Sequence, residues 1–320
     1  MVATALDDGI SLTLLKQLSK VAHLINMSLE QGAVPEVMKI AKVIPIYKAK
    51  CKESFSNYRP ISLLSNISKI LEKVVHKRLY SYLVKHDILY ANQFGFRPKH
   101  STINAITKFT CDVMHYLDKK ESCLSVYLDL SKAVDTIDHS ILLRKLNHYG
   151  IRGRALEWFA SYLCQRKQYI SYQGIKSNDF DVHYGVTQGS VLGPLLFILY
   201  SNDVPNSIKH STSVLFADDT TIYCGGNDIC CLFEQVNNDL CQLSDWFRSN
   251  KLSINANKTK YMLITKQEDA SNVMYHLHVY DEQLEQVTHT QFIGLVIDQH
   301  VNWKCHIDMC RKKISSGLCA

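Results

Sequence analysis

Two neighbouring carboxylates interrupt an apolar stretch of the chain, SVLFADDTTIYC (213–224). The apolar and β-branched residues on either side predict a β-hairpin with Asp218 and Asp219 at its tip. A third carboxylate, Asp129, ends the apolar run SVYLDL (125–130), which predicts a buried strand. If these strands are neighbours, three carboxylates meet at one edge of a sheet. Each would then raise the pKa of the others unless cations neutralise them.

Carboxylate oxygens are ligands that Mg²⁺ prefers, and Mg²⁺ fills its remaining positions with waters and substrate phosphates. Two such ions about 3.5–4 Å apart can activate a primer 3′-hydroxyl and stabilise a leaving pyrophosphate. The three aspartates therefore predict a metal site for phosphoryl transfer. From these residues alone two other interpretations stay open. An Asp-Asp pair is also typical of a solvated turn, and Asp129 could be a helix cap or half of an ion pair.

The composition is that of a globular protein. The 320 residues are 46% hydrophobic and 21% charged, which allows one large domain or two smaller ones. The formal charge of +6 is compatible with a polyanionic partner. The apolar runs are shorter than the roughly 18 residues of a membrane span, and no secretory signal precedes the eleven cysteines. We therefore expect reduced and mostly buried thiols in an intracellular protein without a membrane partner.

The elements that would position the carboxylates alternate between helix and strand. Helical spacing of apolar residues predicts helices over 10–31, 66–86, 101–119, 139–149, 153–166, 193–201 and 228–249. Asp138 is a suitable N-cap for the fourth of these helices. Besides 125–130 and the hairpin, strands are predicted at 42–50, 168–173, 180–186, 259–264, 274–280 and 292–298. The pattern predicts an α+β fold.

The sequence also resembles that of a known protein family. Three stretches resemble the palm motifs of reverse transcriptases of non-LTR (LINE-type) retrotransposons, the Jockey-like group in particular: FADD (216–219), YLDLSKAVDTIDH (127–139) and GVTQGSVLGPLLFILYSND (185–203). Others are similar to that family's fingers motifs and its lysine-bearing palm motif: NYRPISLLSNISKILEKVV (57–75), NQFGFRPKHST (92–102) and NKLSINANKTKYML (250–263). The similarity covers essentially the whole chain, with the motifs in the family's order.

The resemblance implies a right-hand polymerase fold with an antiparallel palm sheet. Residues 1–122 would belong to the fingers, 123–300 to a palm with inserted fingers elements, and 301–320 to the start of a truncated thumb. It also implies an RNA-directed DNA polymerase that adds dNTPs to a primer on an RNA or DNA template. Two Mg²⁺ ions, or Mn²⁺ in their place, would be the cofactors.

Site roles also follow from the resemblance, position by position. Asp129, Asp218 and Asp219 would hold the metals, and Lys258 would protonate the leaving pyrophosphate. The residues that would contact the incoming nucleotide or the template are Leu130, Val134, Gln188, Gly189, Arg59, Lys69 and Arg97. Simpler interpretations stay open for three of these features: an exposed lysine at Lys258, an ion pair at Arg59, and a plain turn at Gln188-Gly189.

Val134 departs from the family pattern, which has an aromatic residue five positions after the first catalytic aspartate. That ring is understood to exclude the ribose 2′-hydroxyl. Since valine is several carbons smaller, we hypothesise that an active form incorporates rNTPs. Sequence decay is the alternative, because valine still fills an apolar position.

Two other functions remain open. The chain could be a catalytically silent remnant of a mobile element with residual nucleic-acid binding, as its short thumb also suggests. It could instead be an RNA-templated RNA polymerase or an intron-type maturase. The sequence predicts neither an oligomeric state nor a choice between nucleus and cytoplasm.

Overall fold

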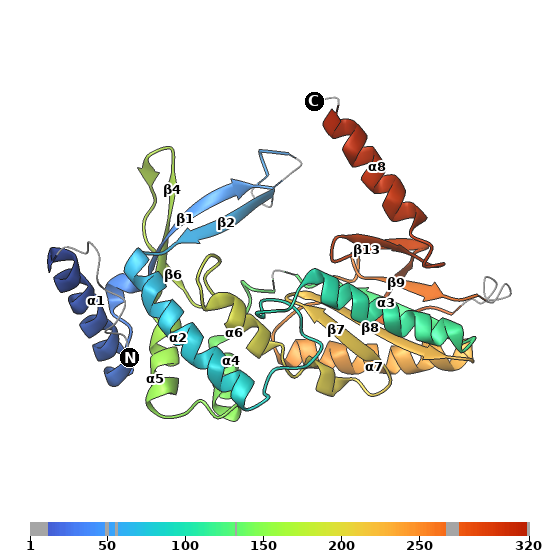
Figure 1. The fold of residues 1–320 in the computed structure, drawn as a ribbon, viewed down its shortest axis with the longest axis horizontal. Coiled ribbons are helices and arrows are strands. Elements are labelled where there is room, and N and C mark those ends of the chain that lie inside the picture. The colour runs from blue at the N-terminus through green and yellow to red at the C-terminus, as the bar shows by residue number, and fades with distance from the viewer. Residues whose placement is uncertain (1–11, 49–50, 55–56, 132, 267–274, 319–320) are drawn as a thin grey trace. The chain divides into compact units, whose positions relative to one another are not determined.

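The computed structural model describes residues 12–48, 51–54, 57–131, 133–266 and 275–318 (Figure 1). The remaining residues, which are 1–11, 49–50, 55–56, 132, 267–274 and 319–320, lie outside the described part of the predicted fingers, palm and thumb. The chain forms two compact units, Met1–Lys85 with Asp138–Leu196, and His86–Ile137 with Phe197–Ala320. The borders at 122/123 and 300/301 stay a prediction, because compactness alone does not define fingers, palm and thumb.

The first unit combines a mixed sheet with helices. The sheet has the order β2-β1-β4-β5, and β6 also pairs with β4. Strand β1 is antiparallel to β2 and parallel to β4. The strands are β1 (Ile40–Tyr47), β2 (Tyr58–Leu63), β4 (Arg166–Tyr172), β5 (Ile175–Lys176) and β6 (Phe180–Val182). The helices are α1 (Leu12–Gln31), η1 (Glu36–Met38), α2 (Asn66–Lys85), α4 (His139–His148) and α5 (Arg154–Leu163).

The second unit is built on a five-stranded sheet with the order β12-β9-β3-β8-β7. The strands are β3 (Ser122–Leu128), β7 (Thr212–Phe216), β8 (Asp219–Gly226), β9 (Lys260–Ile264) and β12 (Glu285–Gln286). Central β3 is antiparallel to β8 and to β9, and all seven of its residues are buried. Short elements complete the unit: η3 (Val204–Ser207), β10 (His278–Val279), β11 (Glu282–Gln283), β13 (His289–Phe292), β14 (Leu295–Asp298) and α8 (Lys304–Leu318).

Helices α3 (Thr102–Asp118) and α7 (Ile229–Ser249) lie on opposite sides of this sheet (Figure 1). Successive side chains of a strand point to opposite faces. On one face Tyr127 and Tyr223 pack in an apolar cluster with Phe109 of α3 and Phe292 of β13. This cluster fixes α3 and the β13–β14 hairpin on the same face of the sheet.

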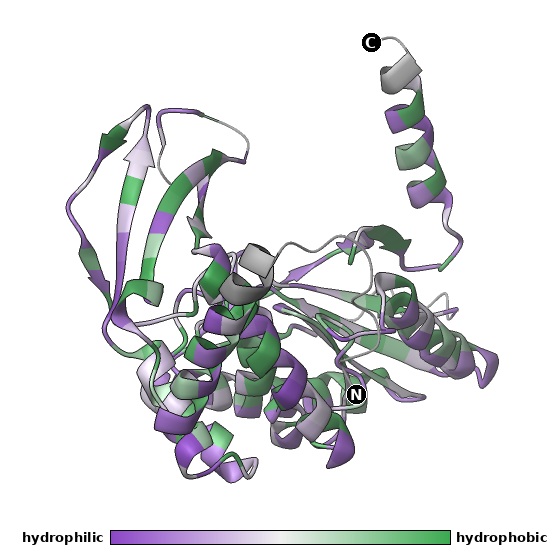
Figure 2. Cartoon of the chain, turned by 60° about the vertical axis from the view of Figure 1, so that its left-hand side comes forward, coloured by the Kyte–Doolittle hydropathy of each residue, from purple (hydrophilic) through white to green (hydrophobic). Residues whose placement is uncertain are grey.

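The division between the units falls within α6 (Gly193–Tyr200), which is hydrophobic on all sides. Every residue of α6 from Leu196 to Tyr200 is fully buried. A helix that is apolar all round is typical of a protein core. In contrast, hydrophilic and hydrophobic residues alternate in bands along α8 near the C-terminus (Figure 2). Ile307 and Ile314 of α8 are exposed.

Most of the predicted elements occur, and three of the differences have a clear physical reason. Strand β2 was missed because Pro60 is atypical of strands, yet β2 is an edge strand, where a missing N–H is tolerated. The single strand predicted over 292–298 is wrong, since β13 and β14 form a hairpin that turns at Ile293-Gly294. Helix α5 ends at Leu163, before the predicted 166, because β4 starts at Arg166.

The ten cysteines in the described part of the chain are free, but only Cys123 and Cys224 are buried, so the prediction of mostly buried thiols is wrong. In that same part, every helix is too short or too polar to cross a lipid bilayer.

Candidate active site

Asp129 and Asp219 come from neighbouring central strands. Leu128 pairs with Thr220 at the end of the antiparallel ladder of β3 and β8, and Asp129 and Asp219 are the next residues beyond that pair. Successive side chains alternate between faces, so both carboxylates are expected on the face of Tyr127 and Thr221, which pair with each other. By alternation from Tyr127, that face carries α3 and the β13–β14 hairpin.

Asp218 lies in the tight turn between β7 and β8. Phe216 pairs with Asp219, so Ala217 and Asp218 are the two turn residues. Ala217 has a φ of 59°, in the left-handed region that costs a non-glycine residue about 1 kcal/mol. A positive φ at the first of two turn residues matches the right-handed twist of the strands, and glycine is usual there. The turn leaves Asp218 exposed at the tip.

Lys258 reaches Asp129 from the segment before β9. The backbone of residues 253–255 runs antiparallel to that of 129–131: Asn255 N–H donates to the Asp129 carbonyl, and Ser131 N–H to the Ser253 carbonyl. A β-bridge between Leu130 and Ile254 joins them. This pairing brings Lys258 Nζ to 3.5 Å from Asp129 Oδ2.

Thr259, which sequence reasoning missed, links Asp129 to the segment before β9 through buried hydrogen bonds. Its side chain is fully buried, and its hydroxyl accepts a hydrogen bond from Asp129 N–H at 3.2 Å. The same hydroxyl donates to the Asn255 carbonyl at 2.9 Å. A lone threonine beside a lysine gives no pattern that would have singled it out.

The carboxylates of Asp129 and Asp219 line a cleft of about 290 Å³. One part of its lining comes from β3, β8, β9 and Lys258, which precedes β9. The other part comes from the β13–β14 hairpin. The lining residues are Tyr127, Leu128, Asp129, Asp219, Thr220, Thr221, Lys258, Lys260, Thr290, Gln291, Phe292, Ile293 and Gly294.

The three aspartates interact electrostatically. The pKa of Asp219 is raised, first because the carboxylate is partly withdrawn from water, and then by the negative charges of Asp218 and Asp129. Neighbouring negative charges disfavour each other's ionisation, and a bound cation removes this repulsion.

The donor chemistry fits Mg²⁺ in part. In the described part of the chain, no three His, Cys, Asp or Glu side chains are already arranged to enclose a metal ion. Mg²⁺ is usually held by one or two carboxylates together with substrate phosphates, so a complete protein cage is not required. The oxygen-only set Asp129, Asp218 and Asp219 suits such a site.

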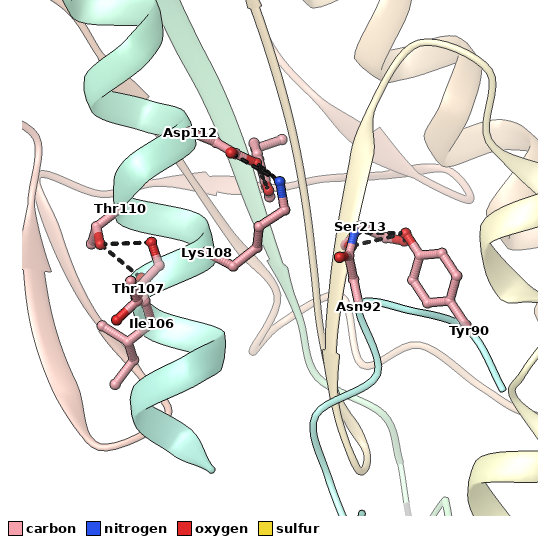
Figure 3. Close-up of polar contacts among 9 residues, drawn as sticks. Tyr90, Asn92, Ile106, Thr107, Lys108, Thr110, Asp112 and Ser213 are labelled. Carbon is pink, nitrogen blue, oxygen red and sulfur yellow. Dashed lines mark hydrogen bonds and ion pairs between the residues drawn. The ribbon is translucent and has the colours of Figure 1, made fainter. Parts of the chain in front are cut away.

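Residues 90–97 form a segment that is paired with β7. Phe94 N–H donates to the Leu215 carbonyl, and Leu215 N–H to the Asn92 carbonyl. The side chains of Tyr90 and Asn92 point toward Ser213, and both donate to its carbonyl (Figure 3). In the same view Lys108 and Asp112 of α3 form an ion pair at 2.7 Å.

Arg97, predicted to meet the nucleotide or the template, contacts the protein backbone here. Its Nη1 donates to the carbonyls of Tyr90 at 2.8 Å and Gln93 at 3.1 Å. These bonds close the 90–97 segment on itself. This arrangement favours a structural role for Arg97.

Leu130 and Val134 follow Asp129 in the same unit, and both are half-buried. Leu130 is tied by its bridge to Ile254, and Val134 lies in the turns between β3 and α4. Their predicted contacts with a nucleotide remain predictions.

The other predicted nucleotide contacts lie in the first unit. Arg59 is exposed on edge strand β2, and Lys69 is half-buried in the first turn of α2. Gln188 accepts from Ser62 N–H at 2.8 Å through its carbonyl, and Gly189 has a φ of 105°. A Cβ at Gly189 would lie 2.6 Å from the Ser62 carbonyl oxygen, so the close approach requires glycine.

Glu72 of α2, another residue that sequence reasoning missed, supports the segment after Gly189. It is 1% exposed, and its carboxylate accepts from Val191 N–H at 2.6 Å and Leu192 N–H at 3.4 Å. Tyr162 donates to the same carboxylate at 3.0 Å. A carboxylate at the start of α6 is favourably placed for the helix dipole.

Solved structures share this fold. The chain superimposes on a telomerase from Candida albicans in complex with a TWJ fragment of telomeric RNA, with a TM-score of 0.55 and 14% identity, over 89% of this chain and 48% of that one. An apo telomerase from Candida tropicalis gives a TM-score of 0.58 and 14% identity, over 88% and 58%. The α+β fold is thus the right-hand polymerase fold predicted from the sequence.

The particular family follows from the sequence itself. The family described as Reverse transcriptase (RNA-dependent DNA polymerase) matches residues 48–297, so the chain belongs to it. The chain is 29% identical to a probable RNA-directed DNA polymerase from transposon BS of Drosophila melanogaster, over 89% of this chain and 32% of that protein. It is 26% identical to the RNA-directed DNA polymerase from mobile element jockey of the same species, over 89% and 32%.

The predicted resemblance to non-LTR retrotransposon enzymes is therefore confirmed. The chain spans about a third of the length of these relatives.

Proposed function

We propose that this chain is the polymerase part of an RNA-directed DNA polymerase, which extends a primer with dNTPs on an RNA or DNA template. The observation that carries the proposal is the register of β3 and β8, which brings Asp129 and Asp219 to the same end of the two strands and into one cleft, with Asp218 in the adjoining turn. Lys258 at 3.5 Å from Asp129 adds a proton donor to the acidic cluster. Membership of the reverse transcriptase family supports the same activity.

In the proposed reaction the 3′-oxygen of the primer attacks the α-phosphorus of a dNTP, and the bond to the bridging oxygen of the pyrophosphate breaks. The hydroxyl proton passes to water. Lys258 delivers a proton to the leaving pyrophosphate and regains one from water, so that the residue is unchanged after a turnover. The pyrophosphate is neutralised as its negative charge develops.

Asp129 and Asp218, with Asp219 beside them, would hold two Mg²⁺ ions, or Mn²⁺ in their place. The ions would supply the charge that lowers the pKa of the 3′-hydroxyl and stabilises the pyrophosphate oxygens. The raised pKa of Asp219 supports this assignment, because it marks a site where negative charge lacks compensation.

The residues assigned to the nucleotide divide between side chains and backbone. We propose that Arg59 and Lys69 meet the triphosphate or the template. Leu130 would offer its backbone to the triphosphate, and Gln188 with Gly189 would lie under the base and sugar. The exposure of Arg59 and the close backbone approach at Gly189 are compatible with these roles.

We also propose an intracellular location, with nucleus and cytoplasm both open, which the free thiols of the described residues support.

The test is extension of a DNA primer annealed to an RNA template, with Mg²⁺ and dNTPs. Asp129→Asn and Asp218→Asn should each lower the rate at least about 10²-fold, because each removes charge that stabilises the transition state. Asp245→Asn is the matched control, since it removes an exposed carboxylate of α7 that pairs with Arg248 at 3.7 Å. It should leave the rate unchanged.

A wild-type chain that folds, binds primer and template but does not extend the primer would identify a silent remnant with residual nucleic-acid binding. Extension that proceeds with rNTPs and fails with dNTPs would identify an RNA-templated RNA polymerase instead.

A further inference from the structure

Gln93 is a buried glutamine with a direct bond to the turn that carries Asp218. Its side chain is 1% exposed. The side-chain oxygen Oε1 accepts from Gly95 N–H at 2.8 Å and from Ala217 N–H at 3.2 Å. Because two backbone donors face this atom, the amide orientation is fixed with the oxygen toward the turn.

The backbone of Gln93 is held as firmly as its side chain. Gln93 forms a parallel β-bridge with Leu215, two residues before the turn. Its carbonyl accepts from Arg97 Nη1 at 3.1 Å. The backbone of Asn92 and Phe94 pairs with Leu215 on either side of it. Gln93 Oε1 therefore approaches Ala217 from the 90–97 segment, which lies along edge strand β7.

The backbone of Gly95 brings the 90–97 segment into contact with the same turn. A Cβ at Gly95 would lie 2.1 Å from Ala217 N and 2.9 Å from Ala217 Cα. Such distances exclude any side chain at this position unless the turn moves. Ala217 is thus confined between the Gly95 backbone and the Gln93 side chain.

Ala217 needs such confinement because its left-handed backbone is strained. A non-glycine residue with a φ of 59° persists where its surroundings leave it no alternative. The bond from Gln93 satisfies the Ala217 N–H in this conformation, and Ala217 is itself buried. The direction of the backbone at Ala217 sets where the side chain of the next residue, Asp218, projects.

A purely structural role does not account for the choice of glutamine. The Nε2 atom of Gln93 is buried without a partner among the described residues. A buried amide that leaves two N–H donors unpaired is destabilising. The benefit that offsets this cost is an uncharged acceptor of the right length at the turn.

We propose that Gln93 is a positioning residue for catalysis: through Ala217 it holds the carboxylate of Asp218 where the metal ions and the primer terminus require it. The proposal rests on the proposed polymerase function. It adds a residue from the 90–97 segment to a site otherwise built from β3, β7, β8 and the segment before β9.

The test compares Gln93→Met with Asn92→Ala. Methionine keeps the length and burial of glutamine but removes the acceptor. Asn92→Ala is the matched control, because the Asn92 side chain also ties this segment to β7: it donates to the Ser213 carbonyl and to the Tyr90 hydroxyl within the segment (Figure 3). Both variants should lower thermal stability.

Only Gln93→Met should change the chemistry. Its kcat for primer extension should fall roughly tenfold to 10²-fold, since small displacements of reacting groups have effects of this size. The Mg²⁺ concentration for half-maximal rate should rise, while the KM for the primer–template stays the same. Equal kcat and Mg²⁺ dependence in Gln93→Met and Asn92→Ala would overturn the proposal.

A measurement without substrate separates this proposal from the proposed function. Amide hydrogen exchange at Ala217 should accelerate in Gln93→Met and stay slow in Asn92→Ala, whether or not the wild-type chain extends a primer. Slow exchange in Gln93→Met would overturn the positioning role even in an active enzyme. If Gln93→Met does not fold, Gln93→Glu, which keeps an acceptor, should retain slow exchange at Ala217, and fast exchange in that folded variant would overturn the role.

Discussion

Lys258 Nζ lies 3.5 Å from Asp129 Oδ2, so the proposed proton donor forms an ion pair with the proposed metal ligand. Both side chains are substantially exposed, and an ion pair of this kind contributes little to the free energy of unfolding. Its significance is chemical. A metal ion bound at Asp129 would compete with the ammonium group for the same oxygen, and Lys258 would then be free to turn toward the pyrophosphate.

Replacement of Lys258 should therefore separate rate from metal affinity. Lys258→Met should lower kcat about 10²-fold, because the pyrophosphate loses its proton donor. The Mg²⁺ concentration for half-maximal rate should fall, because the competing ammonium group is gone. Primer extension over a Mg²⁺ titration measures both quantities.

Lys258→Arg is the control for charge. Arginine keeps the pairing with Asp129 but does not release a proton at any working pH. Its kcat should be as low as that of Lys258→Met, while its Mg²⁺ dependence stays close to wild type. A wild-type kcat in either variant would contradict the role of Lys258 as a proton donor.

The raised pKa of Asp219 predicts a pH dependence of stability. The folded chain holds the Asp219 proton more tightly than the unfolded chain does. Stability without metal should therefore fall as the pH rises from the unfolded pKa of Asp, about 3.9, through the higher folded value. Asp219→Asn should stabilise the metal-free chain at pH 7 by less than about 1 kcal/mol, since solvent screens this exposed carboxylate.

Urea denaturation at pH 7, with and without Mg²⁺, checks this expectation. Mg²⁺ should raise the midpoint of the wild type more than that of Asp219→Asn. The stabilisation by Asp219→Asn should disappear below the unfolded pKa of Asp, where Asp219 is protonated and neutral in both the folded and the unfolded chain. A variant that is less stable than wild type at pH 7 would show that the burial of the Asp219 charge and its repulsion by Asp218 and Asp129 are outweighed by a contact that asparagine does not keep.

The structure explains which parts of the site could be predicted from the sequence. Hydrophobic runs identified the core strand 125–130 and the hairpin, because burial selects residue types directly. The N-cap Asp138 was identifiable since its carboxylate accepts from Ser140 and Ile141, two and three residues away. Local bonds of this kind leave a local pattern in the sequence.

The remaining parts depend on long-range contacts that leave no local pattern. Thr259 bonds to Asp129, 130 positions away, and Gln93 bonds to Ala217, 124 positions away. Each is a single polar residue whose neighbours show no periodicity that reveals its partner. Only the register of the strands brings these residues together.

Glu72 provides a stability prediction in the first unit. Its carboxylate accepts from Val191 N–H, Leu192 N–H and the Tyr162 hydroxyl. Glu72→Leu should lower the free energy of unfolding by about 2–4 kcal/mol, because it leaves these donors unpaired in the interior. Tyr162→Phe removes one of the three bonds and should cost about 1 kcal/mol. Equal effects of the two substitutions in urea denaturation would show that the backbone bonds contribute nothing.

Val134 tests how the site selects its sugar. Its half-buried side chain follows Asp129 by five positions, where an aromatic ring is expected to exclude the 2′-hydroxyl. The wild-type chain should therefore incorporate rNTPs beside dNTPs. Val134→Phe should lower rNTP incorporation roughly tenfold to 10²-fold and leave dNTP incorporation nearly unchanged, because a steric block acts only on the larger sugar. Val134→Ile, which adds one methylene group, should give rNTP incorporation between that of the wild type and that of Val134→Phe.

The measurement is the ratio of kcat/KM for rNTP and dNTP in single-nucleotide extension. A wild-type enzyme that already rejects rNTPs as strongly as Val134→Phe would show that another residue excludes the hydroxyl, and that the smaller side chain at 134 leaves no usable space.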